Sequence, residues 1–356
     1  MRIIIAGGGT GGHIYPAISI ADEILRRNPY NKILFICTKN GFGSDKILNE
    51  GYKLEYISSR GIVGKGLIES IVGATYAIKG VYDSFRIISK FKPNVVIGVG
   101  GYVSGPVVIA TSLHFKPAVI CEQNSIPGLT NRILAIFAKR VFATFDESKK
   151  YFPKVKTRVL GNPIRNQILA VKKTRKTKDR LIVLIFGGSQ GAHKLNISLP
   201  KAFGILGRKD INIIHQTGNH DIENVKKTYE WYGIGSEVLP FIEDMASVYN
   251  NADLVIGRAG AGTIAEITAL GKPSILIPYP FSAYNHQLEN AKMLERAGAA
   301  IIIEDKDAFP ERIAEALNKL LTEDKLNEMM IQAKRLGKPH AAKNIVDEIY
   351  TFTGIN

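Results

Sequence analysis

Glycine clusters next to single polar side chains are the part of this chain best suited to chemistry. The first cluster places five glycines in the six positions 7–12, directly after the apolar run of residues 2–6. Glycines lack the Cβ atoms that keep a backbone away from a bound group, and a helix starting near Pro16 would point its N–H groups there. The cluster therefore predicts an anion-binding loop, with His13 placed to face the bound group.

The same cluster has the G-x-G-x-x-G spacing of dinucleotide-binding proteins at Gly7, Gly9 and Gly12. That fingerprint requires an acidic residue about 20 positions further on, at the end of the second strand. The expected second strand, residues 33–37, is followed by Thr-Lys-Asn, which carries no carboxylate. A nicotinamide enzyme is therefore disfavoured, and we expect no cofactor.

Two further glycine loops follow apolar runs. Residues 98–106 contain Ser104 and Pro106, which indicate a helix start, so a second helix N-terminus would point at the same edge of the sheet. Residues 187–191 match the G-x-S-x-G nucleophile elbow of hydrolases. Because this loop repeats the N-terminal one, in which the matching position is not a nucleophile, we interpret Ser189 as a hydrogen-bond donor to phosphate.

A fourth loop precedes a carboxylate whose role the sequence leaves open. Residues 252–267 read as a strand, a glycine loop and a helix that carries Glu266 in its first turn. Thr263 and Glu266 have the spacing of a capping box, so Glu266 either caps the helix or binds a ligand. The only D-x-D sequence, Asp305-Lys-Asp307, precedes Pro310 and favours a helix-start cap over a metal site. We expect no metal.

These loops recur in a pattern of strand, loop and helix that restarts halfway along the chain. Expected strands in the first half are residues 2–6, 33–37, 54–57, 95–99, 118–122 and 140–143, and those in the second half begin with 181–186 and continue at 212–215, 254–256, 274–277 and 300–303. Between the halves, residues 172–180 hold six basic residues, as in an exposed linker. The chain therefore predicts an α/β protein with two Rossmann-like domains facing a cleft.

Composition and charge restrict the partners. The 356 residues are 45% hydrophobic and 22% charged, and no apolar run approaches the roughly 18 residues that cross a bilayer. No secretory signal begins the chain, so we expect a cytoplasmic protein. Residues 1–160 carry 22 basic and 10 acidic residues, so most of the net charge of +15 lies there. Nucleic acid, an anionic membrane or a phosphate-rich ligand would each suit that charge.

The remaining signals concern the cysteines and one long apolar segment. Cys37 and Cys121 lie in expected strands, which favours buried thiols over a disulfide. Residues 62–92 contain more apolar residues than one buried helix face needs. The expected core stripe is Leu67, Ile71, Ala74, Ile78, Val81, Phe85 and Ile88. The surplus residues are Val63, Ile68, Val72 and Tyr82, which with Lys65, Lys79 and Arg86 could form an apolar patch with a basic rim for anionic lipid, or pack on a neighbouring helix.

Taken in order, seven motifs resemble those of the peptidoglycan N-acetylglucosaminyltransferases, a family with the GT-B fold. The motifs are residues 8–13, 100–106, 122–124, 161–165, 187–191, 258–266 and 286–287. The resemblance implies domains at 1–163, joined by a C-terminal helix at 341–356, and at 164–340. It also implies transfer of N-acetylglucosamine from UDP-N-acetylglucosamine to the C4 hydroxyl of the muramyl sugar of lipid I, with inversion, giving lipid II and UDP in cell-wall synthesis.

The same resemblance assigns roles to individual residues. The positions matching the family's sugar-nucleotide contacts are Thr10, Gly11, Gly12, Asn124, Arg165, Ser189, Ile242, Ala261, Gly262, Thr263, Ile264, Ala265, Glu266 and Gln287. Glu266 would hold the ribose, Arg165 and Ser189 the diphosphate, and Gln287 the sugar. The positions implied to bind the acceptor diphosphate are Gly9, Gly101, Tyr102 and Ser104. His13 would be the general base.

The implied partners are UDP-N-acetylglucosamine, lipid I and an anionic membrane surface at the cytoplasmic face of the cell membrane, where the protein would bind peripherally. A different UDP-sugar-dependent GT-B transferase is the nearest alternative. The interpretation as a nucleic-acid-binding protein is supported by charge alone, because the sequence shows no recognition helix and no aromatic platform.

Overall fold

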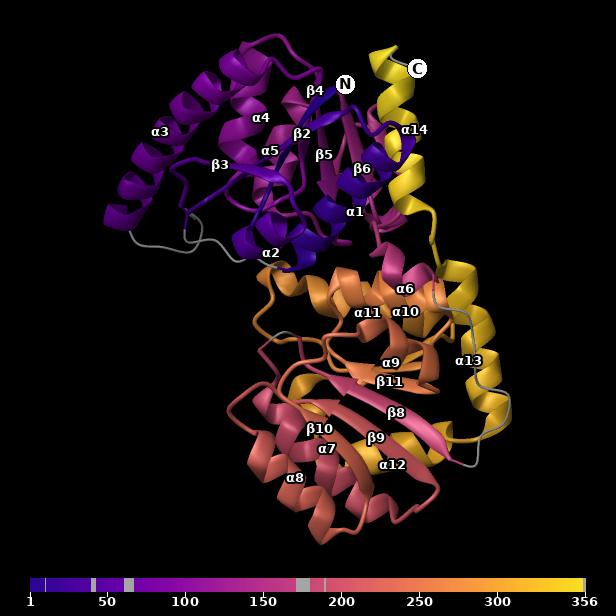
Figure 1. Ribbon diagram of the computed structural model, residues 1–356. Helices are drawn as coiled ribbons and strands as arrows, with labels where there is room; N and C mark the ends of the chain where they lie inside the picture. Colours follow the sequence, from indigo (N-terminus) through magenta and orange to yellow (C-terminus); the bar gives the residue numbers. More distant parts are fainter. Residues whose placement is uncertain (10, 40–42, 61–66, 171–179, 189, 355–356) are drawn as a thin grey trace. The chain divides into compact units, whose positions relative to one another are not determined.

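The computed structural model describes residues 1–354, except residues 10, 40–42, 61–66, 171–179 and 189. The chain folds into two compact units (Figure 1). Unit 1 comprises Met1–Arg165 and His340–Asn356, and unit 2 comprises Asn166–Pro339. Because the division follows Arg165, this arginine belongs to unit 1 rather than to the expected second domain of residues 164–340.

Unit 1 alternates strands and helices. Its elements are β1 (Arg2–Ala6), α1 (Gly11–Arg27), β2 (Lys32–Cys37), α2 (Ser44–Asn49), β3 (Lys53–Tyr56), α3 (Leu67–Phe91), β4 (Val95–Gly98), α4 (Ser104–Leu113), β5 (Ala118–Glu122), α5 (Leu129–Phe137), β6 (Arg140–Ala143), the 3₁₀ helix η1 (Asp146–Tyr151), β7 (Thr157–Val159) and α14 (Ala341–Thr353). The six strands expected from the sequence are confirmed. The three-residue strand β7 is too short to have left a periodic signal.

The sheet of unit 1 is parallel throughout, with the strand order β3-β2-β1-β4-β5-β6-β7. The chain extends outward from β1 in one direction and from β4 in the other, so the order reverses between these two strands. Connections from such neighbours leave on opposite faces of the sheet, which opens a crevice at the carboxyl ends of the strands. Ala6 pairs with Gly98, so the two glycine loops of unit 1 start side by side.

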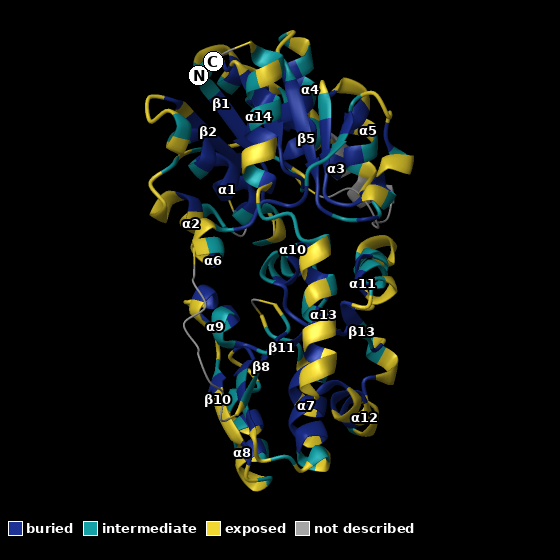
Figure 2. Ribbon diagram, turned by 90° about the vertical axis from the view of Figure 1, so that its right-hand side faces the viewer, coloured by how far each residue is buried: buried dark blue, intermediate teal, exposed yellow. Residues whose placement is uncertain are grey.

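Helices cover both faces of this sheet, as a parallel sheet requires. Because side chains alternate along a strand, Ile3 and Ile5 pack with α1 and α14, whereas Ile4 packs with residues of α3, α4 and α5. Figure 2 shows the result, with the central strands buried and the outer faces of the helices exposed. Cys37 and Cys121 are both buried free thiols, as expected, and burial raises the pKa of each to about 12.

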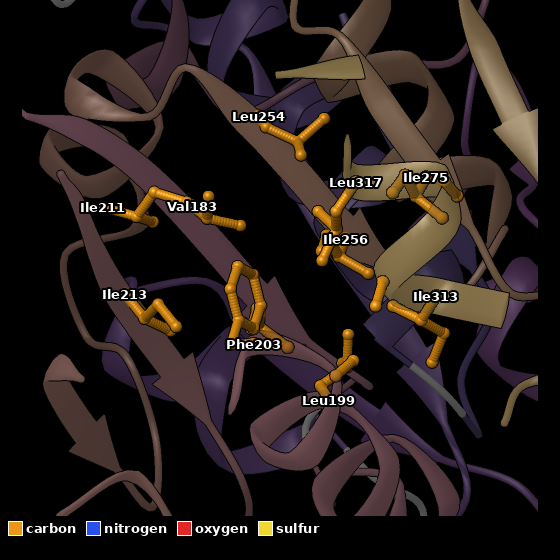
Figure 3. Close-up of a cluster of buried hydrophobic side chains, with 14 of the residues drawn as sticks. Val183, Leu199, Phe203, Ile211, Ile213, Leu254, Ile256, Ile275, Ile313 and Leu317 are labelled. Carbon is orange, nitrogen blue, oxygen red and sulfur yellow. The ribbon is translucent and has the colours of Figure 1, made fainter. Parts of the chain in front are cut away.

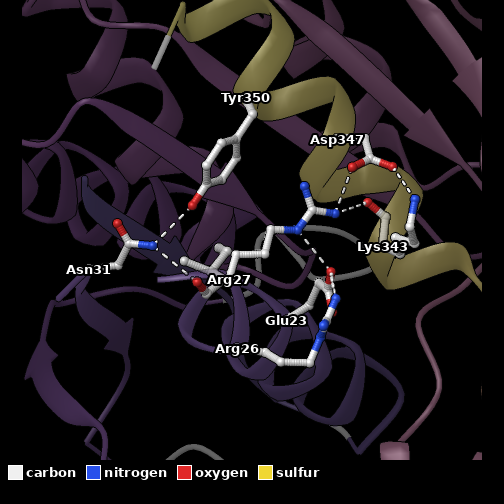
Figure 4. A network of polar contacts seen from close by, with 8 residues as sticks. Glu23, Arg26, Arg27, Asn31, Lys343, Asp347 and Tyr350 are labelled. Carbon is white, nitrogen blue, oxygen red and sulfur yellow. Dashed lines mark hydrogen bonds and ion pairs between the residues drawn. The ribbon is translucent and has the colours of Figure 1, made fainter. Parts of the chain in front are cut away.

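The last helix, α14, is attached to α1 by polar contacts as well as by its apolar face (Figure 4). Arg27 donates to the carbonyl oxygen of Lys343 at 2.9 Å and pairs with Asp347 at 2.7 Å. Glu23 accepts from Arg27 at 2.9 Å, which orients the guanidinium. Asn31 donates to the Tyr350 hydroxyl at 3.0 Å. The C-terminal segment therefore completes unit 1.

Unit 2 repeats this architecture. Its elements are α6 (Asn166–Ala170), β8 (Leu181–Phe186), α7 (His193–Leu206), β9 (Ile211–Gln216), α8 (Ile222–Trp231), β10 (Gly235–Leu239), α9 (Met245–Asn251), β11 (Leu254–Gly257), α10 (Ala261–Leu270), β12 (Ser274–Leu276), η2 (Ala283–Asn285), α11 (His286–Arg296), β13 (Ala300–Ile302), η3 (Asp305–Asp307), α12 (Pro310–Leu320) and α13 (Glu323–Leu336). The expected strands are confirmed. The edge strand β10 was not expected, because its sequence Gly-Ser-Glu-Val-Leu lacks an apolar run.

The sheet of unit 2 is also parallel, in the order β10-β9-β8-β11-β12-β13. Its order reverses between β8 and β11, where Phe186 pairs with Gly257. Figure 3 shows Leu199 and Phe203 of α7, with Ile313 and Leu317 of α12, packed on one face of the strands. Burying a side chain of this size contributes about 1.5–3 kcal/mol, so this core holds the loops after β8 and β11 on a rigid base.

Candidate functional site

The two glycine loops of unit 1 touch each other, and His13 lies at their contact. Gly100 has a φ of +105°, and a Cβ atom there would lie 2.7 Å from Nε2 of His13. Only glycine therefore allows the second loop to pass beside the imidazole. The helix α1 begins at Gly11, earlier than the expected start near Pro16, because Pro16 is accommodated inside the helix. His13 thus sits in the first turn of α1, at the end that favours anions.

The loop between β4 and α4 is held by Ser104. The Ser104 hydroxyl accepts from the Gly100 N–H at 2.9 Å and lies 3.0 Å and 2.9 Å from the carbonyl oxygens of Ala6 and Gly100. Ser104 is fully buried, so its hydroxyl shapes the loop. Tyr102 is 59% exposed at the tip of the same loop.

Of the remaining predicted residues in the first two loops, all except Thr10 belong to the described part of the chain. Gly9, Gly11, Gly12 and Gly101 lie at the carboxyl edge of the sheet with the loops that carry them. Gly9 and Gly101 have φ values of +94° and +77°. Thr10 lies outside the described residues.

The buried side chain of Glu122 hydrogen-bonds to the backbone of Asn124, and the sequence alone did not predict this role. Glu122 ends β5 and is only 3% exposed. Its side chain accepts from the Asn124 backbone N–H at 2.9 Å and from Asn131 Nδ2 at 2.8 Å. Burial raises the pKa of Glu122 to about 7, and these hydrogen bonds oppose the rise. Glu122 therefore links the end of β5 to α5 and fixes the segment that carries Asn124.

Arg165 is the last predicted ligand residue of unit 1 in chain order. Its guanidinium lies over the ring of Tyr15, with 4.6 Å between the guanidinium carbon and the ring centroid. Tyr15 is in the first two turns of α1, so this stacking brings Arg165 to the helix that carries His13. A cation so placed adds to the anion preference of the helix N-terminus.

In unit 2, the loop after β8 is packed tightly against the end of β9. A Cβ atom at Gly191 would lie 1.9 Å from the carbonyl oxygen of Thr217, which excludes every other residue type. Gln216 donates to the Gly188 carbonyl oxygen at 2.9 Å and accepts from the Ile242 N–H at 3.4 Å. Gln216 thereby connects the loop to Ile242, which is buried. Ser189 lies outside the described residues.

A network of hydrogen bonds between buried polar side chains supports this loop, and the sequence did not predict it. Asn196 of α7 donates to the Thr217 carbonyl oxygen at 2.8 Å and to Asp221 at 2.7 Å, and its Oδ1 atom lies 3.2 Å from His215. His215 is fully buried and also contacts the Tyr229 hydroxyl at 3.0 Å. Burial lowers the pKa of His215 to about 3, so it is neutral. This histidine is structural and does not supply the base that a hydrolase would need.

Glu266 does not cap its helix. The helix α10 begins at Ala261 with Gly260 as its N-cap, so Glu266 lies in the second turn and the capping-box interpretation is wrong. The half-buried Glu266 carboxylate instead accepts from the Tyr249 hydroxyl of α9 at 3.0 Å. Of the first-turn residues, Ala261, Ile264 and Ala265 are buried, whereas Gly262 and Thr263 are half-buried. The turn therefore presents backbone N–H groups at the switch point of the sheet.

Gln287 lies at the start of α11 and contacts the loop that carries Tyr279. Its Oε1 atom accepts from the Tyr279 N–H at 2.9 Å, and its backbone N–H donates to Ser282 Oγ at 3.3 Å.

The expected helix cap at Asp305 is wrong, because α12 begins at Pro310 with Phe309 as its N-cap and Asp305 pairs with Arg258 at 2.5 Å. Among the described residues, no group of three or more His, Cys, Asp or Glu side chains is arranged to hold a metal ion.

Comparison with known proteins defines the class. Residues 3–143 match the glycosyltransferase family 28 N-terminal domain, and residues 182–345 match the family's C-terminal domain. These matches cover most of each unit and both switch points. Together with the two parallel sheets, they define a glycosyltransferase with the GT-B fold.

Individual relatives narrow the class further. The chain is 45% identical over 351 residues to the UDP-N-acetylglucosamine–N-acetylmuramyl-(pentapeptide) pyrophosphoryl-undecaprenol N-acetylglucosamine transferase of Syntrophus aciditrophicus, covering 98% of this chain and 97% of that protein. It is 42% identical to the Myxococcus xanthus protein of the same name, covering 98% and 92%. The crystal structure of Acinetobacter baumannii MurG superposes with a TM-score of 0.82 at 31% identity, covering 98% and 99%. The chain belongs to the MurG family of N-acetylglucosamine transferases.

The raised pKa of Glu122 predicts a pH-dependent stability of unit 1. The folded chain holds a proton on Glu122 up to about pH 7, whereas the unfolded chain releases it near the ordinary value of 4.5. Stability should therefore fall as the pH rises from about 4.5 to 7, by on the order of 3 kcal/mol. Urea unfolding of the wild type and of Glu122→Gln, compared across this range, isolates the effect because unit 2 is unchanged. Parallel pH profiles for the two proteins would contradict the assignment.

Proposed function

We propose that this chain transfers N-acetylglucosamine from UDP-N-acetylglucosamine to the C4 hydroxyl of the muramyl sugar of lipid I, forming lipid II and UDP. The observation that carries the proposal is the glycine-lined loop pair at the switch point of each sheet. Each substrate of this reaction brings one diphosphate, and each unit offers one anion-binding edge. The relatives named for this activity cover nearly the whole chain, which favours this acceptor over that of another UDP-sugar transferase.

The proposed chemistry divides between the units. In unit 2, Glu266 binds the ribose hydroxyls, the loop of residues 187–191 binds the donor diphosphate, and Gln287 binds the sugar. In unit 1, the loops of residues 7–12 and 98–104 bind the acceptor diphosphate.

In the reaction itself, His13 takes the proton of the C4 hydroxyl while that oxygen attacks the anomeric carbon. The bond from the anomeric carbon to the phosphate oxygen breaks with inversion, and its electron pair leaves with UDP. Helix N-termini and Arg165 are suited to stabilise the negative charge that develops on the phosphate. The stacking of Arg165 on Tyr15 supports this role, because it fixes the guanidinium in one place.

Acceptor-dependent release of UDP tests the proposed function, and His13 tests the mechanism. A soluble lipid I analogue should stimulate UDP release from UDP-N-acetylglucosamine. In His13→Ala, kcat should fall about 100-fold or more with donor KM nearly unchanged, and the low-pH limb of the kcat profile should change, because a general base is lost. The exposed His340, replaced by alanine, is the matched control.

Two outcomes would contradict these assignments. UDP release that does not depend on the analogue would argue against the proposed acceptor. A His13→Ala variant with raised acceptor KM and unchanged kcat would make His13 a binding residue for the acceptor diphosphate.

The ribose role of Glu266 predicts a selective loss of donor binding. Glu266→Gln keeps the size and the contact with Tyr249 but removes charge-assisted hydrogen bonds worth roughly 1.5–3 kcal/mol. Donor KM should therefore rise about 10-fold or more, with the melting temperature unchanged. Glu289→Gln, at a half-buried position of α11 whose carboxylate pairs with Lys292, serves as the control. A lower melting temperature with normal KM would instead show that Glu266 is structural.

We further propose that unit 1 docks peripherally on the anionic cytoplasmic face of the cell membrane. Ile78 and Phe85, expected in the core stripe of α3, are 73% and 40% exposed, because the buried face of α3 runs through Gly80, Ser84 and Ile88 instead. Tyr82 is exposed, which favours the patch over packing on a neighbouring helix, whereas Val63 and the side chains of Ile68 and Val72 lie outside the described residues.

The end of α4 extends this apolar surface. His114 stacks on Phe85 with 4.0 Å between ring centroids, and Phe115 next to it is 96% exposed. Exposed basic residues accompany the surface, namely Lys79, Arg86, Lys90 and Lys116. An apolar surface with a basic rim suits an anionic bilayer interface. In the described part of the chain, no helix has the length and hydropathy of a membrane span.

Vesicle cosedimentation tests this docking surface. Binding should rise with the content of anionic lipid and fall with salt, since the basic rim acts by screened electrostatics. The double variant Ile78→Ser, Phe115→Ser should bind several-fold more weakly. The matched control is Ile331→Ser, Trp231→Ser, which changes exposed apolar residues of unit 2. If both double variants bind like the wild type, this surface is not the docking site.

A further inference from the structure

Arg258 connects the ends of three neighbouring strands in unit 2. It directly follows β11, and its Nη1 atom lies 3.1 Å and 3.2 Å from the carbonyl oxygens of Ile277 and Pro278, which follow β12. The same atom lies 2.5 Å from Oδ1 of Asp305, which follows β13. The guanidinium carbon is 5.6 Å from the centroid of the Tyr279 ring. One side chain thus sets the spacing of three loops at the carboxyl edge of the sheet.

These loops carry the residues proposed to bind the sugar nucleotide. The helix α10, with Glu266, begins three residues after Arg258. The loop after β12 leads to Tyr279, whose N–H donates to Oε1 of Gln287. With its oxygen fixed in this way, the Gln287 side-chain amide has a defined orientation, and its Nε2 atom is directed by the same contact. The position of Gln287 therefore depends on the loop that Arg258 holds.

Asp305 is the only carboxylate that the structure pairs with Arg258 among the described residues. The side chains of the two residues are 12% and 18% exposed, so both charges are largely removed from water. A guanidinium in such a place needs a paired carboxylate, because an unpaired buried charge is costly. Asp305 lies in the 3₁₀ helix η3, where the Ala308 N–H donates to its carbonyl oxygen at 3.3 Å, so its backbone is fixed independently of Arg258.

We propose that Asp305 is a positioning residue for the sugar part of the donor. Its carboxylate holds Arg258, Arg258 holds the segment from Ile277 to Tyr279, and the Tyr279 N–H orients the amide of Gln287. Asp305 itself touches no substrate in this scheme. The inference rests on the proposed function, because it takes Gln287 as the sugar contact, and it gives the D-x-D sequence a role that needs neither a metal nor a helix cap.

Binding of UDP and of UDP-N-acetylglucosamine, measured separately by isothermal titration calorimetry, tests the inference. In Asp305→Asn, the Kd for UDP-N-acetylglucosamine should rise about 10-fold and the Kd for UDP should stay within about twofold, because Glu266 and the phosphate loop are not displaced. Asp307→Asn is the matched control: this exposed residue lies two positions away in the same D-x-D sequence. A wild-type protein that binds neither nucleotide would contradict the proposed function rather than this inference.

A double-mutant cycle with Gln287 separates positioning from general loosening. If Asp305 acts through Gln287, then Asp305→Asn should cause no further loss of UDP-N-acetylglucosamine binding in a Gln287→Ala background. Asp305→Glu should recover part of the affinity, since it restores the charge. Equal weakening of both nucleotides, unchanged binding of the sugar nucleotide, or full additivity with Gln287→Ala would each overturn the proposal. Should Asp305→Asn fail to fold, the same cycle is run with Arg258→Lys, which keeps the charge next to Asp305 but loses the guanidinium contacts with Ile277 and Pro278, and the same outcomes decide.

Discussion

The reversal of strand order within each parallel sheet is the constraint on which the rest of this structure depends. Neighbouring strands whose connections leave on opposite faces open a crevice at their carboxyl ends, between β1 and β4 in unit 1 and between β8 and β11 in unit 2. The backbone must turn sharply on both sides of each crevice. This is why a Cβ atom at Gly100 would collide with His13, and why one at Gly191 would collide with Thr217. The glycine loops are thus a consequence of topology before they are ligand sites.

Glycine-rich loops have a flexible backbone, and buried polar side chains fix these loops by hydrogen bonds. In unit 1, Ser104 ties the second loop to β1, and Glu122 ties the segment of Asn124 to α5. In unit 2, Gln216 ties the loop after β8 to Ile242, and Arg258 ties three strand ends together. Glu122, Gln216 and Arg258 sit at or just past the carboxyl end of a strand, and Ser104 is the first residue of α4. Loops of low intrinsic order are therefore held in one arrangement by a small number of satisfied hydrogen bonds.

Local signals in the sequence predict the elements that depend on adjacent residues. Apolar runs identified the central strands, and glycine clusters identified the ligand loops, because burial and tight turns leave their mark on adjacent residues. Contacts between distant residues were not predictable. Arg258 and Asp305 are 47 positions apart, and no local pattern links them, so the sequence alone favours a helix cap for the D-x-D sequence. The capping-box spacing of Thr263 and Glu266 predicts a helix that starts just after Thr263. The helix α10 instead starts three residues earlier, at the crevice, and this start depends on the sheet rather than on Thr263. Ile78 fits the helical spacing of a core residue but faces outward, because the buried face of α3 is formed by the small residues Gly80 and Ser84, which give no apolar signal in the sequence.

Hydrogen–deuterium exchange of the full chain with each substrate separately tests the central claim that the two units bind different diphosphates at their switch points. UDP should slow exchange at the loop of residues 187–191 and at the first turns of α10. A soluble lipid I analogue should slow exchange at residues 7–13 and 98–104, and the protection from both should add when both are present. Protection of the unit 1 loops by UDP alone, with no protection near α10, would contradict the account.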